Sequence, residues 1–586
     1  MSVTAIAIQE SRKSWRDYLT VALPLQGRIT LTVILLVGFV LRVWWMVSEA
    51  PVISSDGAEY ARMAEHLFYD HALVGNFEGP EIIYGPLYPF LIAGTMLVVR
   101  NSETAAHIVS LISGVALIAT VFLLALHVYG RRTAYVCALL VSVHPLLVAL
   151  SGSVYNEALY LTVLMALVYC GVRALDLQGR RDYLLLGICL GLAYLTRVEA
   201  FAYVLFFVAA LLTAGLLRRM ARAAVIGSII AVAVFFALAS PYVAFLYNHT
   251  GTLRLEAKWD MNYTMARNRL AGMSDTEAEY AVDKDGEVKG PMLAPAGFTD
   301  GTPYPHTLMD RLRTLASMAK YHKGVLYRFF NLSRIGSPVL LTLVVLGLVR
   351  QSWSKRRVGH EVVLLTMTGS VAFFVLASAA GEFRYFLPIV PLLLIWAGKG
   401  IDELRLWIMG WELLRDGRSS GAGIIAGGLQ VCALVSMIML SIHGIRKESL
   451  FVDEHSSAAL AERDAAVWLA HYDPRPKRIA VRFAVVPYYA KGTLIGLPYG
   501  DPEATTRYLA AKNVDFVVLE SGYAQELPAV GEWVAHGIRD ARAQLIYDRT
   551  NSNGDRVIIY RWQARTDDGN VSLGSHPGGD VPSRAL

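Results

Sequence analysis

The 586-residue chain is poor in charge and in cysteine. Lys, Arg, Asp and Glu make up 17% of it, against about a quarter in ordinary soluble proteins, and 55% is hydrophobic. This balance excludes a typical soluble enzyme and predicts a polytopic membrane protein. The four cysteines all lie inside apolar runs, so neither disulfides nor a thiolate metal site is expected. The net charge of +6 is modest, and no nucleic-acid partner is expected.

The N-terminal stretch MSVTAIAIQESRKSWRDYL lacks the apolar core and small-residue cleavage site of a secretory signal. It is polar and basic, and we expect residues 1–28 to be cytoplasmic. Further basic clusters follow at 131–132, 180–181, 218–222 and 350–357. Basic loops face the cytoplasm in most membrane proteins. Placed by this rule, the hydrophobic runs predict about eleven spans: 29–47, 104–128, 134–151, 157–174, 183–196, 199–217, 223–246, 335–350, 361–379, 385–397 and 422–443.

One apolar run, GPLYPFLIAGTMLVV at 85–99, does not fit as a span. It is shorter than the ~20 residues that a span needs, and it carries two prolines. A crossing here would also put the later basic clusters on the wrong side. We therefore predict an outer loop over 48–103 that contains this run as a non-spanning segment. A second, polar outer loop is predicted over 247–334, and residues 29–443 form the membrane domain.

The C-terminal region predicts a small α/β domain over 444–563 on the outer side. RIAVRFAVV (478–486) and VDFVVLES (514–521) have the composition of strands, and PEATTRYLAAK (502–512) that of a helix. QLIYDRTNSNGDRVIIYRW (544–562) predicts a β-hairpin with Asn-Ser-Asn-Gly-Asp at its turn. Residues 564–586 are rich in Gly, Pro and Ser and are expected to be disordered.

Charged residues recur where spans meet the outer surface, and ionisable groups at such depth usually mark function. By the predicted topology, four loops open on the same side. We therefore expect them to line one cavity at the outer interface: Asp56; Asn156 with Glu157; Arg197 with Glu199; and Glu382 with Arg384.

A cavity of carboxylates and arginines suits the transfer of a sugar from a lipid phosphate. A carboxylate can deprotonate an acceptor hydroxyl. Arginine can bind the phosphate through paired hydrogen bonds and stabilise the charge that grows as it leaves. One base and phosphate-binding cations would suffice, with or without a metal ion.

Five stretches of the membrane domain resemble the GT-C-fold glycosyltransferases, in the branch of protein O-mannosyltransferases and lipid A aminoarabinose transferases. They are SSDGAEYARMAEHLF, IIYGPLYPFLIAG, GSVYNEALYLTVLMALVY, LTRVEAF and RYFLPIVPLLLIWAG. The resemblance implies a GT-C fold and an inverting transfer from a polyprenyl-phosphate sugar, with the first-loop aspartate as base, which is Asp56 here. Two positions depart from the pattern: Gly57 replaces a glutamate of many relatives, and Tyr84-Gly85 replaces a lysine of the aminoarabinose transferases.

On this basis we predict a hexosyl- or pentosyltransferase of the bacterial inner membrane, with its C-terminal domain in the periplasm. Asp56 is the predicted base, and Glu157 orients the acceptor or, with Asp56, a divalent metal ion. The predicted substrate-binding residues are Arg384, Arg197, Tyr60, Tyr88 and Glu59. The donor is a polyprenyl-phosphate sugar, and the acceptor a lipid, glycan or protein of the cell envelope. A transporter or flippase of lipid-linked sugars is the alternative.

Several of these residues also have a structural explanation. Asp56 and Glu59 have the spacing of a capping box, with Asp56 as N-cap. Glu157 could complement a helix dipole, Arg197 could form a salt bridge with Glu199, and Arg384 could extend to lipid headgroups. The tyrosines Tyr60, Tyr84 and Tyr88 could be interfacial aromatics. Three cations of the large loop are further phosphate-ligand candidates, Lys258, His322 and Lys323, and His144 beside Pro145 is expected to be a packed polar residue.

Overall fold

The computed structural model describes residues 24–77, 79–293, 338–349, 353–377, 383–416 and 457–563, with isolated residues between the last two of these segments and at 309. The chain divides into two compact units. The first comprises Met1–Glu279 and Ala294–Leu460, and the second Tyr280–Leu293 and Ala461–Leu586. His322, Lys323 and Glu382, and most of the predicted span 422–443, lie outside the described residues.

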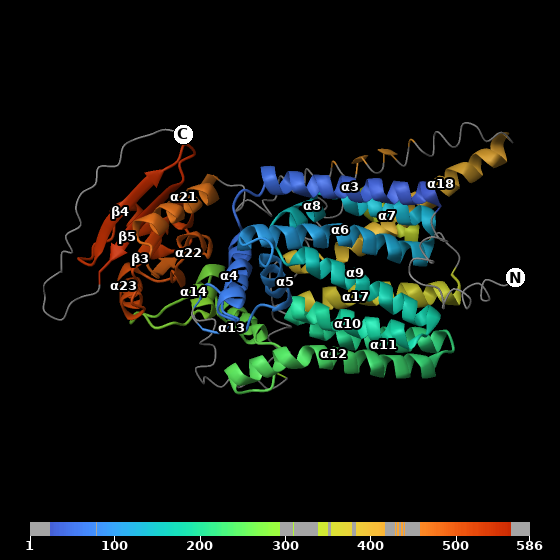
Figure 1. Cartoon of the computed structure of the whole chain (residues 1–586), viewed down its shortest axis with the longest axis horizontal. Coiled ribbons are helices and arrows are strands. Elements are labelled where there is room, and N and C mark those ends of the chain that lie inside the picture. Colours follow the sequence, from blue (N-terminus) through green and yellow to red (C-terminus); the bar gives the residue numbers. More distant parts are fainter. Residues whose placement is uncertain are drawn as a thin grey trace. The chain divides into compact units, whose positions relative to one another are not determined.

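The first unit is helical, and its long helices run side by side (Figure 1). Its described helices are α3 (Leu25–Ser48), α4 (Ser55–Tyr69), α5 (Leu87–Met96), α6 (Ser102–Tyr129), α7 (Arg131–Val143), α8 (Pro145–Gly152), α9 (Glu157–Leu177), α10 (Arg180–Thr196), η1 (Val198–Ala200), α11 (Phe201–Leu217), α12 (Ala221–Thr250), α13 (Lys258–Leu270), α14 (Asp275–Tyr280, whose last residue begins the second unit), α16 (Pro338–Val349), α17 (Lys355–Ala377), η4 (Phe383–Phe386) and α18 (Ile389–Asp416).

Six of the described helices are long and apolar enough to cross a membrane, or seven if the bent pair α7 and α8 forms one span. A polar backbone can cross lipid only when its hydrogen bonds close within the segment, which is why these apolar runs fold as helices. Each of the first ten predicted spans overlaps a helix of the structure. The total of eleven stays a prediction, because several of these helices are too short or too charged to be assigned as spans by composition. The helix α5 has 10 residues and is too short to cross alone, in agreement with the expected non-spanning segment.

The predicted span 134–151 is broken, because Pro145 cannot continue the hydrogen bonding of α7. The axes of α7 and α8 meet at 58°, with His144 buried at the break. The last carbonyls of α7 are therefore left without helical partners. Arg42 of α3 bonds two of them, donating from Nη1 to the Ser142 oxygen (3.1 Å) and from Nη2 to the Val141 oxygen (3.3 Å). Arg42, which the sequence placed in an ordinary span, therefore stabilises this break.

The second unit is a five-stranded mixed sheet with helices, as the α/β prediction expected (Figure 1). Its elements are η2 (Pro291–Leu293), α21 (Ser457–Tyr472, which begins in the first unit), β1 (Arg478–Val481), α22 (Val485–Ala490), β2 (Thr493–Gly496), α23 (Pro502–Ala511), β3 (Phe516–Glu520), η5 (Ser521–Tyr523), α24 (Pro528–His536), β4 (Ala543–Thr550) and β5 (Arg556–Trp562). The strand order is β2-β1-β3-β5-β4. The strands β1, β2 and β3 are parallel, and β5 runs antiparallel to both β3 and β4.

The predicted hairpin is present, and β3 at its side is buried along its whole length. Its first four residues, Phe516 to Leu519, form a continuous hydrophobic run, as is typical of a strand buried on both faces. Residues 280–293, which the sequence placed within the loop 247–334, belong to this unit. The guanidinium of Arg482, next after β1, lies 3.7 Å from the Tyr280 ring centroid, and Tyr499 N–H donates to the Tyr280 carbonyl (2.8 Å). These contacts hold the segment on the sheet.

Candidate active site

Asp56 lies in the first turn of α4, but it is not the N-cap. That position belongs to Ser54, whose Oγ accepts a hydrogen bond from the Gly57 N–H (3.0 Å). The capping box predicted for Asp56 and Glu59 is therefore wrong. Its physical reason is simple: serine and aspartate both cap helices well, and here the chain enters the helix two residues earlier. The Asp56 carboxylate is consequently available for contacts outside its own helix.

Two such contacts hold the Asp56 carboxylate. Arg384 of η4 donates from Nη1 to Oδ2, forming an ion pair, and the Tyr84 hydroxyl donates to Oδ1 (3.3 Å). Burial alone would raise the pKa of Asp56, but the positive charges of Arg384, Lys258 and Arg197 outweigh it, so the pKa lies below its usual value. Asp56 is therefore an ionised carboxylate at neutral pH.

Arg197 joins α10 to η1 and is buried between two carboxylates. It donates to Glu157 Oε1 (3.0 Å) and to Glu199 Oε1 (2.7 Å). The salt bridge to Glu199, which was the structural alternative to a phosphate-binding role for Arg197, is present. Glu157 is the first residue of α9, so it also lies at the positive end of that helix. Arg197 thus has its charge and two of its donors, Nε and Nη1, engaged within the protein.

Lys258 is the one cation of this region with no carboxylate partner among the described residues. It is the first residue of α13. Its ammonium lies 5.9 Å from the ring centroid of Tyr84 and 5.4 Å from that of Tyr385. Burial would lower its pKa, but Tyr385 and Glu199 nearby outweigh this effect, so the pKa is raised and the side chain stays charged. An ammonium beside two aromatic faces can still donate to a further acceptor, since it carries three N–H groups.

A narrow cleft opens beside these charges. One part of its lining is charged and contains Glu157, Arg197, Glu199 and Arg384; the rest is aromatic or aliphatic: Tyr160, Leu161, Tyr203, Phe374, Tyr385, Leu387 and Pro388. The guanidinium of Arg197 lies 5.0 Å from the centroid of Tyr385. The cleft therefore offers a polar end and an apolar wall, as an amphipathic ligand would need.

Three predicted substrate-binding residues of the first outer loop are buried inside the protein. The Tyr60 ring packs edge-on against Tyr84 and Tyr88, and its hydroxyl accepts from Asn156 Nδ2 (2.7 Å). Tyr88 is fully buried, and its hydroxyl bonds Ser110 Oγ (2.7 Å). Glu59 is 3% exposed and accepts from both the backbone and the side chain of Asn76. Tyr88 and Glu59 thus have hydrogen-bond partners inside the protein, and their predicted substrate contacts stay a prediction.

The four predicted outer positions thus come together where the structure describes them. Asp56 and Arg384 form one pair, and Glu157, Arg197 and Glu199 form a second group along the same cleft. Each carboxylate of the metal pair predicted from sequence has an arginine partner: Asp56 pairs with Arg384, and Glu157 shares Arg197 with Glu199. A metal role for Asp56 and Glu157 stays a prediction.

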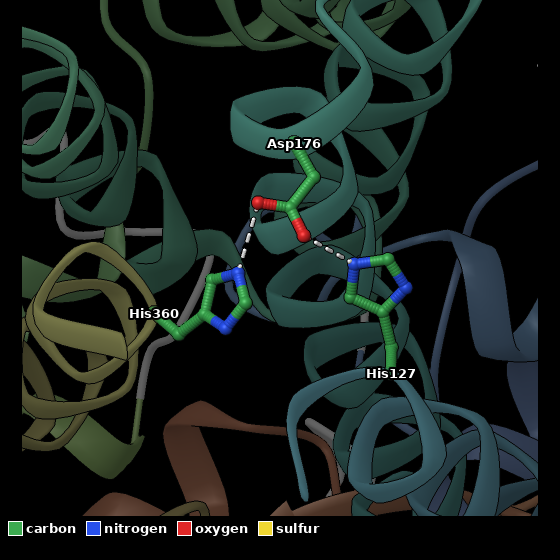
Figure 2. Close-up of side chains that lie close together, drawn as sticks. All are labelled: His127, Asp176 and His360. Carbon is green, nitrogen blue, oxygen red and sulfur yellow. Dashed lines mark hydrogen bonds and ion pairs between the residues drawn. The ribbon is translucent and has the colours of Figure 1, made fainter. Parts of the chain in front are cut away.

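A different trio has the spacing of a metal site among the described residues: His127 of α6, Asp176 of α9 and His360 of α17 (Figure 2). The two histidines bond opposite oxygens of Asp176, at 2.9 and 3.0 Å. Asp176 lies at the end of α9 away from Glu157, about 30 Å along the helix at 1.5 Å per residue. The trio is therefore remote from the cleft.

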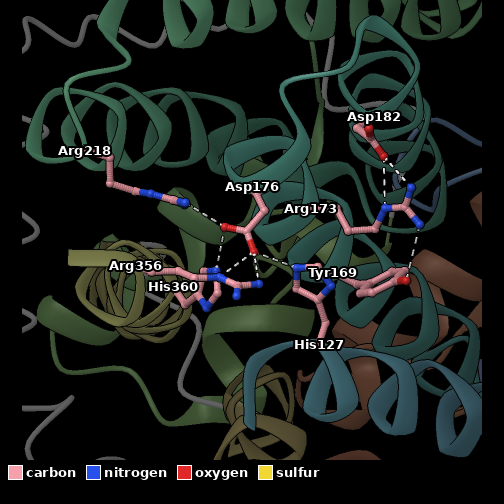
Figure 3. A network of polar contacts seen from close by, with 8 residues as sticks. All are labelled: His127, Tyr169, Arg173, Asp176, Asp182, Arg218, Arg356 and His360. Carbon is pink, nitrogen blue, oxygen red and sulfur yellow. Dashed lines mark hydrogen bonds and ion pairs between the residues drawn. The ribbon is translucent and has the colours of Figure 1, made fainter. Parts of the chain in front are cut away.

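Two arginines complete the surroundings of Asp176 (Figure 3). Arg218 Nη2 lies 2.8 Å from Oδ1, and Arg356 Nη2 lies 2.6 Å from Oδ2. Each carboxylate oxygen thus has two donors, which fills its lone pairs. Two guanidinium charges would also repel a cation. The group does not suit a metal ion; it is a hydrogen-bonded hub that ties together α6, α9, α17 and the end of α11.

Comparisons with known proteins agree with this fold. The computed structure is similar to the oligosaccharyltransferase AglB of Archaeoglobus fulgidus, solved with an inhibitory peptide and a dolichol-phosphate: the TM-score is 0.59 at 13% identity, over 96% of this chain and 76% of that one. It is also similar to ArnT of Cupriavidus metallidurans bound to undecaprenyl phosphate, with a TM-score of 0.52 at 14% identity, over 94% of this chain and 99% of that one. The chain therefore has the GT-C fold of membrane glycosyltransferases, as its motifs predicted.

A family model described as dolichyl-phosphate-mannose-protein mannosyltransferase matches residues 83–245. This stretch is well short of half the chain; it contains Tyr84, Glu157 and Arg197 but neither member of the Asp56–Arg384 pair. No curated protein matches the chain in a sequence search.

Proposed function

We propose that this membrane protein is a glycosyltransferase that moves a sugar from a polyprenyl phosphate to an acceptor hydroxyl. The observation that carries the proposal is the ion pair between Asp56 and Arg384 at a cleft with one charged and one apolar side. The GT-C fold and the family-model match support the same class. Dolichol-phosphate and undecaprenyl phosphate bind the two similar structures and are the model for the donor lipid here.

Asp56 is the general base in this proposal. The acceptor O–H gives its proton to the Asp56 carboxylate, and the oxygen forms a bond to the anomeric carbon from the face opposite the phosphate. The bond from that carbon to the phosphate oxygen breaks, and polyprenyl phosphate leaves with the electron pair. One displacement of this kind inverts the anomeric centre. The phosphate leaves already ionised, so no acid is needed on its side.

The ion pair with Arg384 holds Asp56 ionised but also makes it a weak base. A donor phosphate competes for the same guanidinium, since arginine binds phosphate through two parallel hydrogen bonds. Once Arg384 turns to the phosphate, Asp56 loses its nearest positive charge and accepts a proton more readily. Donor binding and activation of the base are thereby coupled through one side chain.

Lys258 is the second phosphate ligand in this scheme, because its charge has no carboxylate partner among the described residues. Arg197 is a weaker candidate than the sequence suggested, since Glu157 and Glu199 already neutralise it. In this scheme Glu157 acts on the acceptor indirectly: it holds Arg197 in place and so helps to shape the cleft. Tyr84 is a tyrosine that donates directly to the proposed base Asp56.

The orientation in the membrane is proposed from the basic loops. Arg131, Arg180, Arg218 and Lys355 begin or end helices away from the Asp56 end of the molecule, and such residues face the cytoplasm. The cleft then opens on the periplasmic side of a bacterial inner membrane, with residues 1–28 in the cytoplasm and the domain 444–563 in the periplasm. Labelling of single cysteines introduced at the exposed residues Arg132 and Asp70, in intact cells, tests this orientation.

Undecaprenyl phosphate is the probe for the function itself. Purified protein in detergent is expected to retain it in native mass spectrometry, and membranes holding the protein are expected to consume a polyprenyl-phosphate sugar when envelope acceptor is added. Binding without consumption would favour a transporter of lipid-linked sugars. Failure to bind any polyprenyl phosphate would contradict the proposal.

A further inference from the structure

Two buried carboxyl groups of the first outer loop have no part in the transfer chemistry. Glu59 of α4 is 3% exposed, and Glu81, just before α5, is 6% exposed. Neither forms an ion pair with a described residue. Carboxylates are almost never buried without a cation beside them, because removing the charge from water is costly.

The two carboxyl groups converge on the backbone of Gly75. A Cβ built there would overlap Glu59 Oε1, at 1.5 Å, and would lie 3.3 Å from Glu81 Oε2. Glu59 accepts from Asn76 N–H (2.9 Å) and Nδ2 (2.8 Å). This leaves Glu81 facing Glu59 across a glycine, with its other oxygen turned to the chain beyond.

That other oxygen, Glu81 Oε1, accepts the N–H groups of Ile83 (2.7 Å) and Tyr84 (3.1 Å). The buried Tyr242 hydroxyl of α12 donates to carbonyls of the same turn, at 3.3 Å from the Ile82 oxygen and 3.4 Å from the Tyr84 oxygen. The Tyr84 hydroxyl then reaches Asp56. A short chain of bonds thus runs from the buried acid Glu81 through Tyr84 to the proposed base.

The charges around Glu59 and Glu81 determine whether the two carboxyl groups are protonated. Burial, and then the charge of Glu81, raise the pKa of Glu59, and burial raises that of Glu81. The cations that face them are Arg62 of α4 and Lys258 of α13, and both act more weakly than burial. The other titratable neighbours are the neutral Tyr84 and Tyr242. Two negative charges in this place are therefore unfavourable, and one bound proton removes the repulsion.

We propose that Glu59 and Glu81 share one proton at neutral pH and act as positioning residues that hold the Tyr84 hydroxyl against Asp56. This proposal rests on the proposed function only in that Asp56 is the general base. Asp56 and Glu59 lie one helical turn apart and both bond the loop that follows α4. In this proposal Asp56 transfers the proton, and Glu59 helps to hold the loop that carries Tyr84.

The local contacts are tested by hydrogen–deuterium exchange of full-length protein over 74–84. In Glu81→Ala, the Ile83 and Tyr84 amides lose their acceptor and exchange about tenfold faster. Glu81→Gln keeps an acceptor oxygen and restores most of the protection. Asp70→Asn, an exposed carboxylate at the end of α4, is the matched control and leaves exchange unchanged. Equal protection in wild type and Glu81→Ala would contradict the positioning role.

The shared proton is tested by the pH dependence of thermal unfolding. The pKa of Glu59 is raised from 4.5 in the unfolded chain to about 8 in the folded protein. The folded state is therefore favoured fully below pH 4.5, and this contribution to stability is lost as the pH rises through about 8. The melting temperature of wild type is expected to fall across this window. The double variant Glu59→Gln/Glu81→Gln loses that slope, and Asp70→Asn retains it. A slope unchanged in the double variant overturns the proposal, as does stabilisation by Mg²⁺ that only wild type shows.

Neither measurement depends on sugar transfer, so their failure and that of the proposed function are distinguishable. Where transfer is measured, Glu81→Ala is expected to lower the maximal rate about tenfold with little change in the donor concentration for half-saturation, and Glu81→Gln to recover it. Loss of donor binding in Glu81→Ala, with a normal maximal rate, would contradict a role through Tyr84 and Asp56.

Discussion

Asp56 and Arg384 form an ion pair although 328 residues separate them in the chain. The pair joins the first turn of α4 to the turn η4, which precedes α18. It also sets the ionisation of the proposed base.

Lys258→Ala is expected to weaken the binding of undecaprenyl phosphate about tenfold or more. The reason is the loss of a charge-assisted hydrogen bond, worth about 1.5–3 kcal/mol. Lys258→Arg retains part of the affinity. Lys289→Ala, a lysine of the second unit that is paired with Asp283, serves as control. Affinity is measured by titration of the lipid in nanodiscs, and equal affinities for wild type and Lys258→Ala would remove Lys258 from the phosphate site.

The acid limb of the transfer activity is expected to depend on Arg384. With a folded pKa below the reference value of 3.8, Asp56 stays ionised as pH falls to that value, and its contribution to stability is lost only below it. Arg384→Gln removes the main positive neighbour, so the pKa of Asp56 rises and the acid limb moves to higher pH. The profile of kcat/KM against pH shows this directly, because kcat/KM reports the free enzyme, in which Arg384 still pairs with Asp56. An acid limb at the same pH in both proteins would mean that Arg384 does not control Asp56.

Asp176→Ala is expected to destabilise the protein by about 3–5 kcal/mol, because it strips two histidines and two arginines of a buried acceptor. Arg356→Gln, whose side chain is 53% exposed, should cost less than about 1 kcal/mol. Thermal unfolding in detergent compares the two. Added Zn²⁺ should leave the wild-type melting temperature unchanged. A stabilisation by Zn²⁺ that Asp176→Ala abolishes would instead identify the trio as a metal site.

Much of the helical unit could be predicted from the sequence, since long apolar runs and basic loops carry its topology. The convergence of Asp56, Glu157, Arg197 and Arg384 followed from sidedness alone. Which carboxylate pairs with which arginine could not be predicted, because knowing the side of the membrane on which a loop lies gives no distances between its residues and others. The place of Lys258 could not be predicted for the same reason: that it has no carboxylate partner among the described residues is known only once the ion pairs of the other cations are known.

Local ambiguity explains other differences. Ser54, Ser55 and Asp56 are all good N-cap residues, so the sequence could not say which one begins α4. The 58° break at Pro145 was hidden in a run apolar enough to be one span. Residues 280–293 join the second unit through contacts with segments about 200 residues away, which no local pattern reports.

The most direct test of the central claim is the rate of sugar transfer by Asp56→Asn in native membranes. Its folding is checked by melting temperature, and its donor site by the binding of undecaprenyl phosphate. Asparagine keeps the shape and the contact with Tyr84 but cannot accept the acceptor proton. The account predicts bound lipid and a transfer rate lowered at least about a hundredfold, as expected for loss of a general base. A folded, lipid-binding Asp56→Asn protein that transfers sugar at the wild-type rate would contradict it.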